Sequence, residues 1–230
     1  MYQSAAIGEL PDQAAVSLPK LVIFDCDGVL VQSEEISLSV LISLLNVYAT
    51  HETLLDAQYF IEHFRGRKIA ECLREAEQLL NVRLPSQFEH DFREHALLAL
   101  TRELKATDGI VDVLKGLNIP YCVASSAPRH KIEHCLRLTG LLPYFETRIF
   151  SCYELGRWKP DPLVFLTACQ AHGVAVGDAL VIEDSVTGIQ AAVAANIRVL
   201  GFGPLERHGK LAEAGALPFA DMRQLLTIIH

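Results

Sequence analysis

The stretch Leu21-Val22-Ile23-Phe24-Asp25-Cys26-Asp27-Gly28 decides the fold of this chain. Its four apolar residues predict a buried strand, because a parallel strand covered on both faces reads as a continuous apolar run. Asp25 and Asp27 follow two positions apart, so their carboxylates point to the same side, and Gly28 permits a sharp turn out of the strand. Crowded carboxylates repel, so a cation or a proton has to lie between them. Acidic caps are also common at strand ends, and this stretch alone leaves both interpretations open.

Four further apolar runs predict the other strands of a parallel sheet, at residues 121–124, 148–150, 180–182 and 198–202. Helical segments alternate with these runs, which indicates an α/β fold with a doubly wound, Rossmann-like sheet. The block between the first two runs is helical by period and too long for a crossover, so we expect an inserted helical domain. We predict a flexible N-terminal tail (1–19), a core domain (20–33 and 104–230) and the helical insert (34–103).

The composition excludes several classes of protein. Of the 230 residues, 50% are apolar, and 20 Lys and Arg stand against 28 Asp and Glu, which gives a formal charge of −8. We expect no nucleic-acid partner, because phosphate backbones require clustered Lys and Arg. The six cysteines form no C-x-x-C pair, and we find neither a signal peptide nor an apolar run long enough to span a bilayer. We therefore expect a cytoplasmic protein with reduced thiols and no membrane partner.

Chemically active residue types follow or flank the other predicted strands as well. Ser125-Ser126 follows the second strand, Lys159 lies in a proline-stiffened segment before the fourth, and Glu183-Asp184 ends the fourth. Ligands bind beyond the carboxyl ends of strands in such sheets, so these side chains are expected to converge there with Asp25. Carboxylate oxygens suit a hard cation such as Mg²⁺, while a lysine and hydroxyls suit phosphate oxygens. Four such positions together favour a binding site over ordinary capping.

These motifs resemble those of the haloacid dehalogenase superfamily. The match consists of Asp25-Cys26-Asp27-Gly28-Val29-Leu30-Val31, Ser125, Lys159-Pro160-Asp161-Pro162 and Glu183-Asp184-Ser185-Val186-Thr187-Gly188-Ile189, in the family's order. The helical insert is similar to the cap of the sugar-phosphatase and β-phosphoglucomutase-like branch. Within that branch, Arg157-Trp158-Lys159-Pro160 and the cap loop resemble the bacterial 6-phosphogluconate phosphatases. The resemblance implies a phosphoric monoester hydrolase that acts on small phosphorylated metabolites.

The resemblance also implies a role for each motif residue. Asp25 is the expected nucleophile, which carries the phosphoryl group as an aspartyl phosphate. Asp27 is the expected general acid and base. Lys159 and Ser125, helped by Ser126, are expected to hold the phosphate oxygens.

Mg²⁺ is the implied cofactor. Its expected ligands are Asp25, Asp184 and the carbonyl of Asp27, with Glu183 as a direct or an indirect ligand. The cap loop is expected to read the substrate through Arg65, Gly66, Arg67 and Lys68, because cations around a glycine suit an anionic sugar acid. A solvated, basic helix start is the other interpretation of that loop.

Two alternative functions stay open at this point. A phosphosugar mutase would use the same aspartyl phosphate but return the phosphoryl group to the sugar. A receiver-type signalling module also combines an acceptor aspartate with acidic metal ligands, a hydroxyl and a lysine, although receivers place the acceptor after the third strand. Dehalogenation is disfavoured, because the founding dehalogenases lack an acid at the position of Asp27. We expect the chain to act as a monomer.

Overall fold

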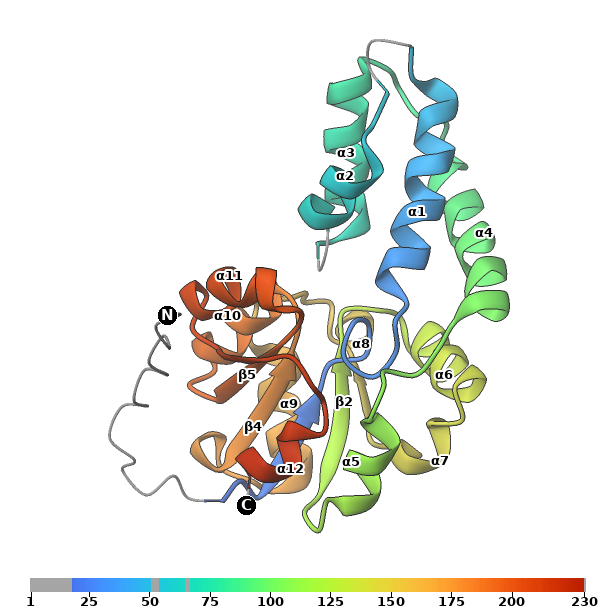
Figure 1. Cartoon of the computed structure of the whole chain (residues 1–230). Coiled ribbons are helices and arrows are strands. Elements are labelled where there is room, and N and C mark those ends of the chain that lie inside the picture. Colours follow the sequence, from blue (N-terminus) through green and yellow to red (C-terminus); the bar gives the residue numbers. More distant parts are fainter. Residues whose placement is uncertain (1–17, 51–53, 65–66, 230) are drawn as a thin grey trace, which may run out of the picture.

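A six-stranded parallel sheet forms the centre of the molecule, in the strand order β3-β2-β1-β4-β5-β6 (Figure 1). The computed structural model describes residues 18–50, 54–64 and 67–229, so the expected N-terminal tail falls almost entirely outside the described residues. The strands are β1 (Leu21–Phe24), β2 (Tyr121–Ser125), β3 (Ile149–Ser151), β4 (Ala179–Glu183), β5 (Arg198–Phe202) and β6 (Leu217–Phe219). This topology confirms the predicted doubly wound α/β class.

The expectation of five strands was wrong, because β6 adds a sixth. It has three residues with Pro218 in the middle, and it pairs with β5 at the edge of the sheet. Proline cannot donate a ladder hydrogen bond, so it occurs in sheets mainly on edge strands. Such a short run also gives no periodic signal in the sequence.

Helices cover both faces of the sheet. Alternate residues of a strand point to opposite faces, so Val22 and Phe24 contribute to one hydrophobic cluster and Leu21 and Ile23 to the other. The first face packs against α5 (Ile110–Gly116), α6 (Arg129–Leu138), α7 (Leu142–Phe145) and α12 (Gln224–Ile228). The second packs against α8 (Cys152–Leu155), α9 (Leu163–His172), α10 (Val186–Ala194) and α11 (His208–Glu213). Short 3₁₀ turns span Asn46–Tyr48, Val176–Asp178 and Leu205–Arg207.

Four helices between β1 and β2 form a separate unit, which lies beyond one end of the sheet (Figure 1). They are α1 (Glu34–Leu45), α2 (Ala57–Phe64), α3 (Ile69–Leu80) and α4 (Phe88–Glu103). Most of their buried side chains make a third hydrophobic cluster, whereas Leu100 of α4 joins the cluster on the first face of the sheet. Within the described residues, no helix is both long and apolar enough to cross a membrane.

Two linkers join this unit to the sheet, and they lie side by side. The amide of Gln32 donates to the carbonyl of Lys105 at 3.0 Å, and the amide of Thr107 donates to the carbonyl of Leu30 at 3.0 Å. An antiparallel bridge between Val31 and Ala106 completes the pairing. The chain therefore enters and leaves the helical unit at one place, directly beside the end of β1.

Candidate active site

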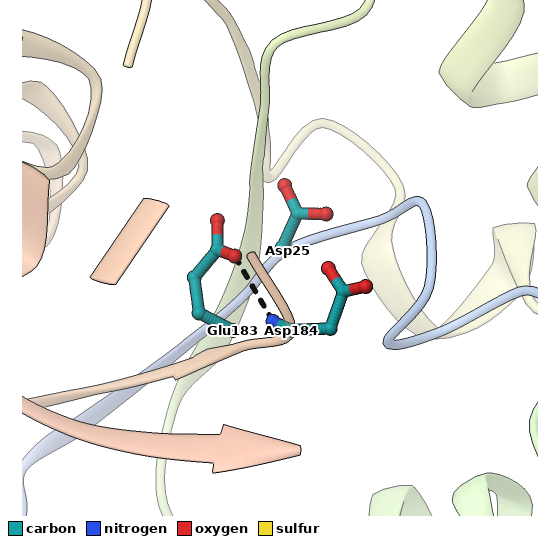
Figure 2. Close-up of side chains that lie close together, drawn as sticks. All are labelled: Asp25, Glu183 and Asp184. Atoms are coloured by element: carbon teal, nitrogen blue, oxygen red, sulfur yellow. Dashed lines mark hydrogen bonds between the residues drawn. The ribbon is translucent and has the colours of Figure 1, made fainter. Parts of the chain in front are cut away.

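Three carboxylates meet at the carboxyl edge of the sheet. Asp25 follows β1, Glu183 ends β4 and Asp184 follows it, and β1 and β4 are neighbours in the sheet. Figure 2 shows the three side chains close together, and they offer carboxylate oxygens that all lie within 4.8 Å of one another. All three residues are buried. The predicted convergence of these distant residues is thus present in the structure.

Lys159 joins two of these carboxylates. Its Nζ donates to Asp25 Oδ1 at 2.5 Å, to Glu183 Oε1 at 2.6 Å and to the carbonyl of Ala124 at 3.0 Å. Burial alone would lower the pKa of this ammonium, but the Asp25 and Glu183 carboxylates outweigh burial and raise it. The raised pKa favours the charged form of Lys159 beside Asp25.

Glu183 is fixed by hydrogen bonds on both of its oxygens. Oε2 accepts from the amides of Asp184 and Ser185, each at 3.0 Å, and from Ser185 Oγ at 2.9 Å. Ser185 also caps α10, because its Oγ accepts from the amide of Gly188 at 3.0 Å. A side chain at Gly188 would overlap the Glu183 carboxylate. A glycine in this helix therefore makes room for a buried acid.

Three carboxylates face two cations at this site: Lys159, which pairs with Asp25 and Glu183, and Arg207, whose Nη1 lies 3.5 Å from Asp184 Oδ2. Burial raises the pKa of Asp25 well above its usual range; Lys159 acts in the opposite direction, while Glu183 and Asp184 add to the rise. Gly28 has a φ of 84°, and a Cβ there would overlap the carboxylate of Asp184. A divalent cation would offset the excess charge, and buried carboxylate oxygens are the donors that a hard cation prefers.

Asp27 lines the same cleft beside these three carboxylates and has its own partners. Lys131 Nζ donates to Asp27 Oδ1 at 2.9 Å, and Ser33 Oγ donates to the same oxygen. Burial acts to raise the pKa of Asp27, but the charge of Lys131 and the hydrogen bond from Ser33 outweigh it, so the pKa is lowered. Sequence reasoning did not single out Lys131 or Ser33. The available signal was that Lys131 lies in the first turn of α6, the helix that begins just after Ser125.

Ser125 and Ser126 lie beside this site, as predicted. Ser125 is buried, and its Oγ accepts from the amide of Ala127 at 3.1 Å. Both serines line the cleft that contains Asp25, Asp27 and Lys159. The end of β2 and the residue after it therefore place two hydroxyl-bearing side chains in the same cleft as the carboxylates.

The helical unit forms the opposite wall of the cleft. Arg67 and Lys68 line it, whereas Arg65 and Gly66 lie outside the described residues. Arg67 pairs with Glu75 at 2.9 Å, and Lys68 Nζ lies 4.0 Å from the centre of the Trp158 ring. The loop before α3 thus contacts the core through a cation–π interaction.

A second contact joins the two walls. Arg93 of α4 donates to the Tyr153 hydroxyl of α8 at 2.8 Å, and it also pairs with Glu89 at 2.6 Å. Tyr153 packs edge-on against Trp158, with ring centres 5.2 Å apart. The cleft is therefore enclosed by the sheet edge below and by basic and aromatic side chains above.

Comparison with known proteins shows which family this chain belongs to. The family model for haloacid dehalogenase-like hydrolases matches residues 19–196. The chain belongs to the haloacid dehalogenase-like hydrolase family. It is 30% identical over 205 residues to the 6-phosphogluconate phosphatase of Escherichia coli K12, covering 89% of this chain and 91% of that one. The membership confirms the predicted resemblance and the predicted class, a phosphoric monoester hydrolase.

Solved structures of the haloacid dehalogenase-like family agree with the fold. A haloacid dehalogenase-like protein of unknown function from Agrobacterium tumefaciens has a TM-score of 0.82 and 33% identity, covering 91% of this chain and 97% of that one. A family hydrolase from Deinococcus radiodurans, solved with bound phosphate and sodium, has a TM-score of 0.74 and 28% identity, with 91% and 94% covered. Both likenesses span the sheet and the helical unit.

Proposed function

We propose that the chain is a Mg²⁺-dependent phosphatase that hydrolyses small phosphorylated sugars or sugar acids, such as 6-phosphogluconate, through an aspartyl phosphate on Asp25. The observation that carries the proposal is the buried group of Asp25, Asp184 and Lys159 at the sheet edge, with Asp27 beside it. A nucleophile, an acid-base group, a fixed cation and a cation-binding pair are the parts that phosphoryl transfer requires.

The reaction has two half-reactions. Asp25 attacks the phosphorus as the bond to the sugar oxygen breaks, and Asp27 donates a proton to the departing oxygen. Water then attacks the phosphorus and gives a proton to Asp27, which releases phosphate and restores Asp25. An arriving phosphate dianion raises the pKa of Asp27 from its lowered value, so the same group can serve as acid and then as base.

The remaining residues bind and neutralise the phosphate. Lys159 and Ser125 hold its oxygens, with help from Ser126. Asp25 and Asp184, together with the Asp27 carbonyl, would hold Mg²⁺, which offsets charge on the phosphate oxygens.

Glu183 has a different part in this proposal. Both of its oxygens accept hydrogen bonds already, and we assign it to holding Lys159 and the end of β4 rather than to direct metal binding.

The insert, residues 34–103, is proposed to act as a cap that closes over the edge of the sheet. Its Arg67 and Lys68 line the same cleft as the carboxylates, which supports recognition of a second anionic group on the substrate. The E. coli relative named for 6-phosphogluconate supports the same substrate class.

Release of phosphate from a panel of esters tests this proposal. The protein is stripped with EDTA and assayed with and without added Mg²⁺ on 6-phosphogluconate and glucose 6-phosphate, which differ in the carboxylate at carbon 1. We expect phosphate release only with the metal and a lower KM for the acid. An isomerised sugar phosphate in place of free phosphate would indicate a mutase, and no turnover of any ester would refute the proposal.

A further inference from the structure

Among the described residues, the side-chain donors to the Asp27 carboxylate all bind the same oxygen. Its Oδ1 accepts both the Lys131 ammonium and the Ser33 hydroxyl. The two donors come from different parts of the chain: Lys131 from the first turn of α6, and Ser33 from the residue that precedes α1. Two donors on one oxygen fix the rotation of a carboxylate about its χ2 bond, which is otherwise broad.

The two donors differ in their surroundings. Ser33 is fully buried, and its hydroxyl is held by the hydrogen bond that it donates to Asp27 Oδ1. The Lys131 side chain is 27% exposed and lines the cleft together with Asp27. The charge of Lys131 is therefore at the active site, although no family motif predicted it.

We propose that Lys131 and Ser33 are positioning residues that anchor Asp27 Oδ1 and thereby direct Oδ2 toward the oxygen of the leaving group. In the first half-reaction Oδ2 passes its proton to that oxygen while the phosphorus–oxygen bond to the sugar breaks and the bond to Asp25 forms. In the second, Oδ2 takes a proton from the attacking water as the bond between phosphorus and Asp25 breaks. This inference rests on the proposed phosphatase function and adds the residues that aim its acid.

The rival role for Lys131 is direct binding of the phosphate. A phosphate ligand would act on every ester alike, because all of them carry the same phosphoryl group. A residue that aims the acid matters only where the leaving oxygen needs a proton. An alkyl phosphate such as 6-phosphogluconate needs one, whereas 4-nitrophenyl phosphate leaves as a stable phenolate. A comparison of esters with different leaving groups therefore distinguishes the two roles of Lys131.

The experiment compares kcat/KM on these two esters, because kcat/KM reports the steps up to departure of the leaving group. For Lys131→Met we expect a loss of about 10- to 100-fold on the alkyl ester, since a misplaced acid forfeits part of the 10²–10⁴-fold that acid catalysis supplies. On the aryl ester the expected change is less than about threefold. Ser33→Ala is expected to show the same contrast, because it removes the other donor to the same oxygen.

Two reference variants make the result decisive. Lys115→Met, an identical substitution of an exposed lysine on α5, is expected to leave both esters unchanged. Asp27→Asn removes the acid itself and therefore gives the largest expected difference between the losses of kcat/KM on the alkyl and the aryl ester. Equal losses on both esters for folded Lys131→Met and Ser33→Ala would overturn the inference. If the contrast appears in Asp27→Asn alone, the phosphatase proposal stands and only the inference fails.

Discussion

Replacing Gly188 by alanine tests the site, because we expect this substitution to lower the stability of the fold, whereas glycine to alanine in a helix usually raises it. Within a helix, glycine to alanine normally stabilises a protein by up to about 1 kcal/mol, and Gly188 is the third residue of α10. At Gly188 the added methyl group would overlap the buried carboxylate of Glu183, whose own movement is restricted by its hydrogen bonds. We therefore expect Gly188→Ala to destabilise the fold.

The magnitude follows from the bonds that Glu183 makes. Four donor contacts hold its oxygens: Lys159, the amides of Asp184 and Ser185, and the Ser185 hydroxyl. A displaced carboxylate that loses two of them costs about 3–6 kcal/mol, at about 1.5–3 kcal/mol for each hydrogen bond to a charged group. After the helix gain of about 1 kcal/mol, the net loss is about 2–5 kcal/mol. For a chain of this size the Tm falls by about 4–20 °C, at about 2–4 °C for each kcal/mol.

Urea and thermal unfolding, followed by circular dichroism, measure this change. Gly209→Ala is the matched control, since Gly209 also lies in a helix but has open space where its Cβ would be. We expect the control to be as stable as the wild type or slightly more so, with full turnover. Gly188→Ala should also lose turnover, because Lys159 depends on Glu183 for its position. If the two variants were equally stable and active, the placement of Glu183 against α10 would be refuted.

Three other outcomes are expected. Asp25→Asn should abolish phosphate release while the protein still melts cooperatively; turnover in the folded variant would remove Asp25 as the nucleophile. Arg67→Ala and Lys68→Ala should raise KM for 6-phosphogluconate more than they lower kcat, and unchanged kinetics would separate this loop from the substrate. Burial raises the pKa of the Cys72 thiol to about 12, so between about pH 9 and 11 the folded state keeps a proton that the unfolded chain loses. Stability to urea should therefore fall as pH rises through this window, and less steeply in Cys72→Ala.

The sequence was sufficient to predict that Asp25 and Asp184 meet. Each follows an apolar run that reads as a parallel strand, and the carboxyl ends of parallel strands share one edge of the sheet. Strand assignment alone does not place Lys159, which lies between α8 and α9; its place beside the phosphate was expected from the family resemblance.

The features that sequence reasoning missed depend on contacts between elements. Ser33 and Lys131 meet at Asp27 only because the linker to α1 and the first turn of α6 lie on the same side of the sheet edge. Neither residue belongs to a local pattern that marks a partner. The contact of Lys68 with Trp158 likewise depends on how the insert sits on the core, which periodicity within each segment does not report.

The paired linkers between the helical unit and the sheet have a consequence for how such enzymes diversify. Because the two linkers are hydrogen-bonded to each other at Gln32 and Lys105, the whole insert joins the sheet at one place, which we call its base. Exchanging residues 34–103 for another helical module, with Ser33 retained, would leave the strands, their order and the edge that carries Asp25 and Asp184 untouched. New substrate preferences can therefore arise by recombination at one junction, without redesign of the chemistry beneath it.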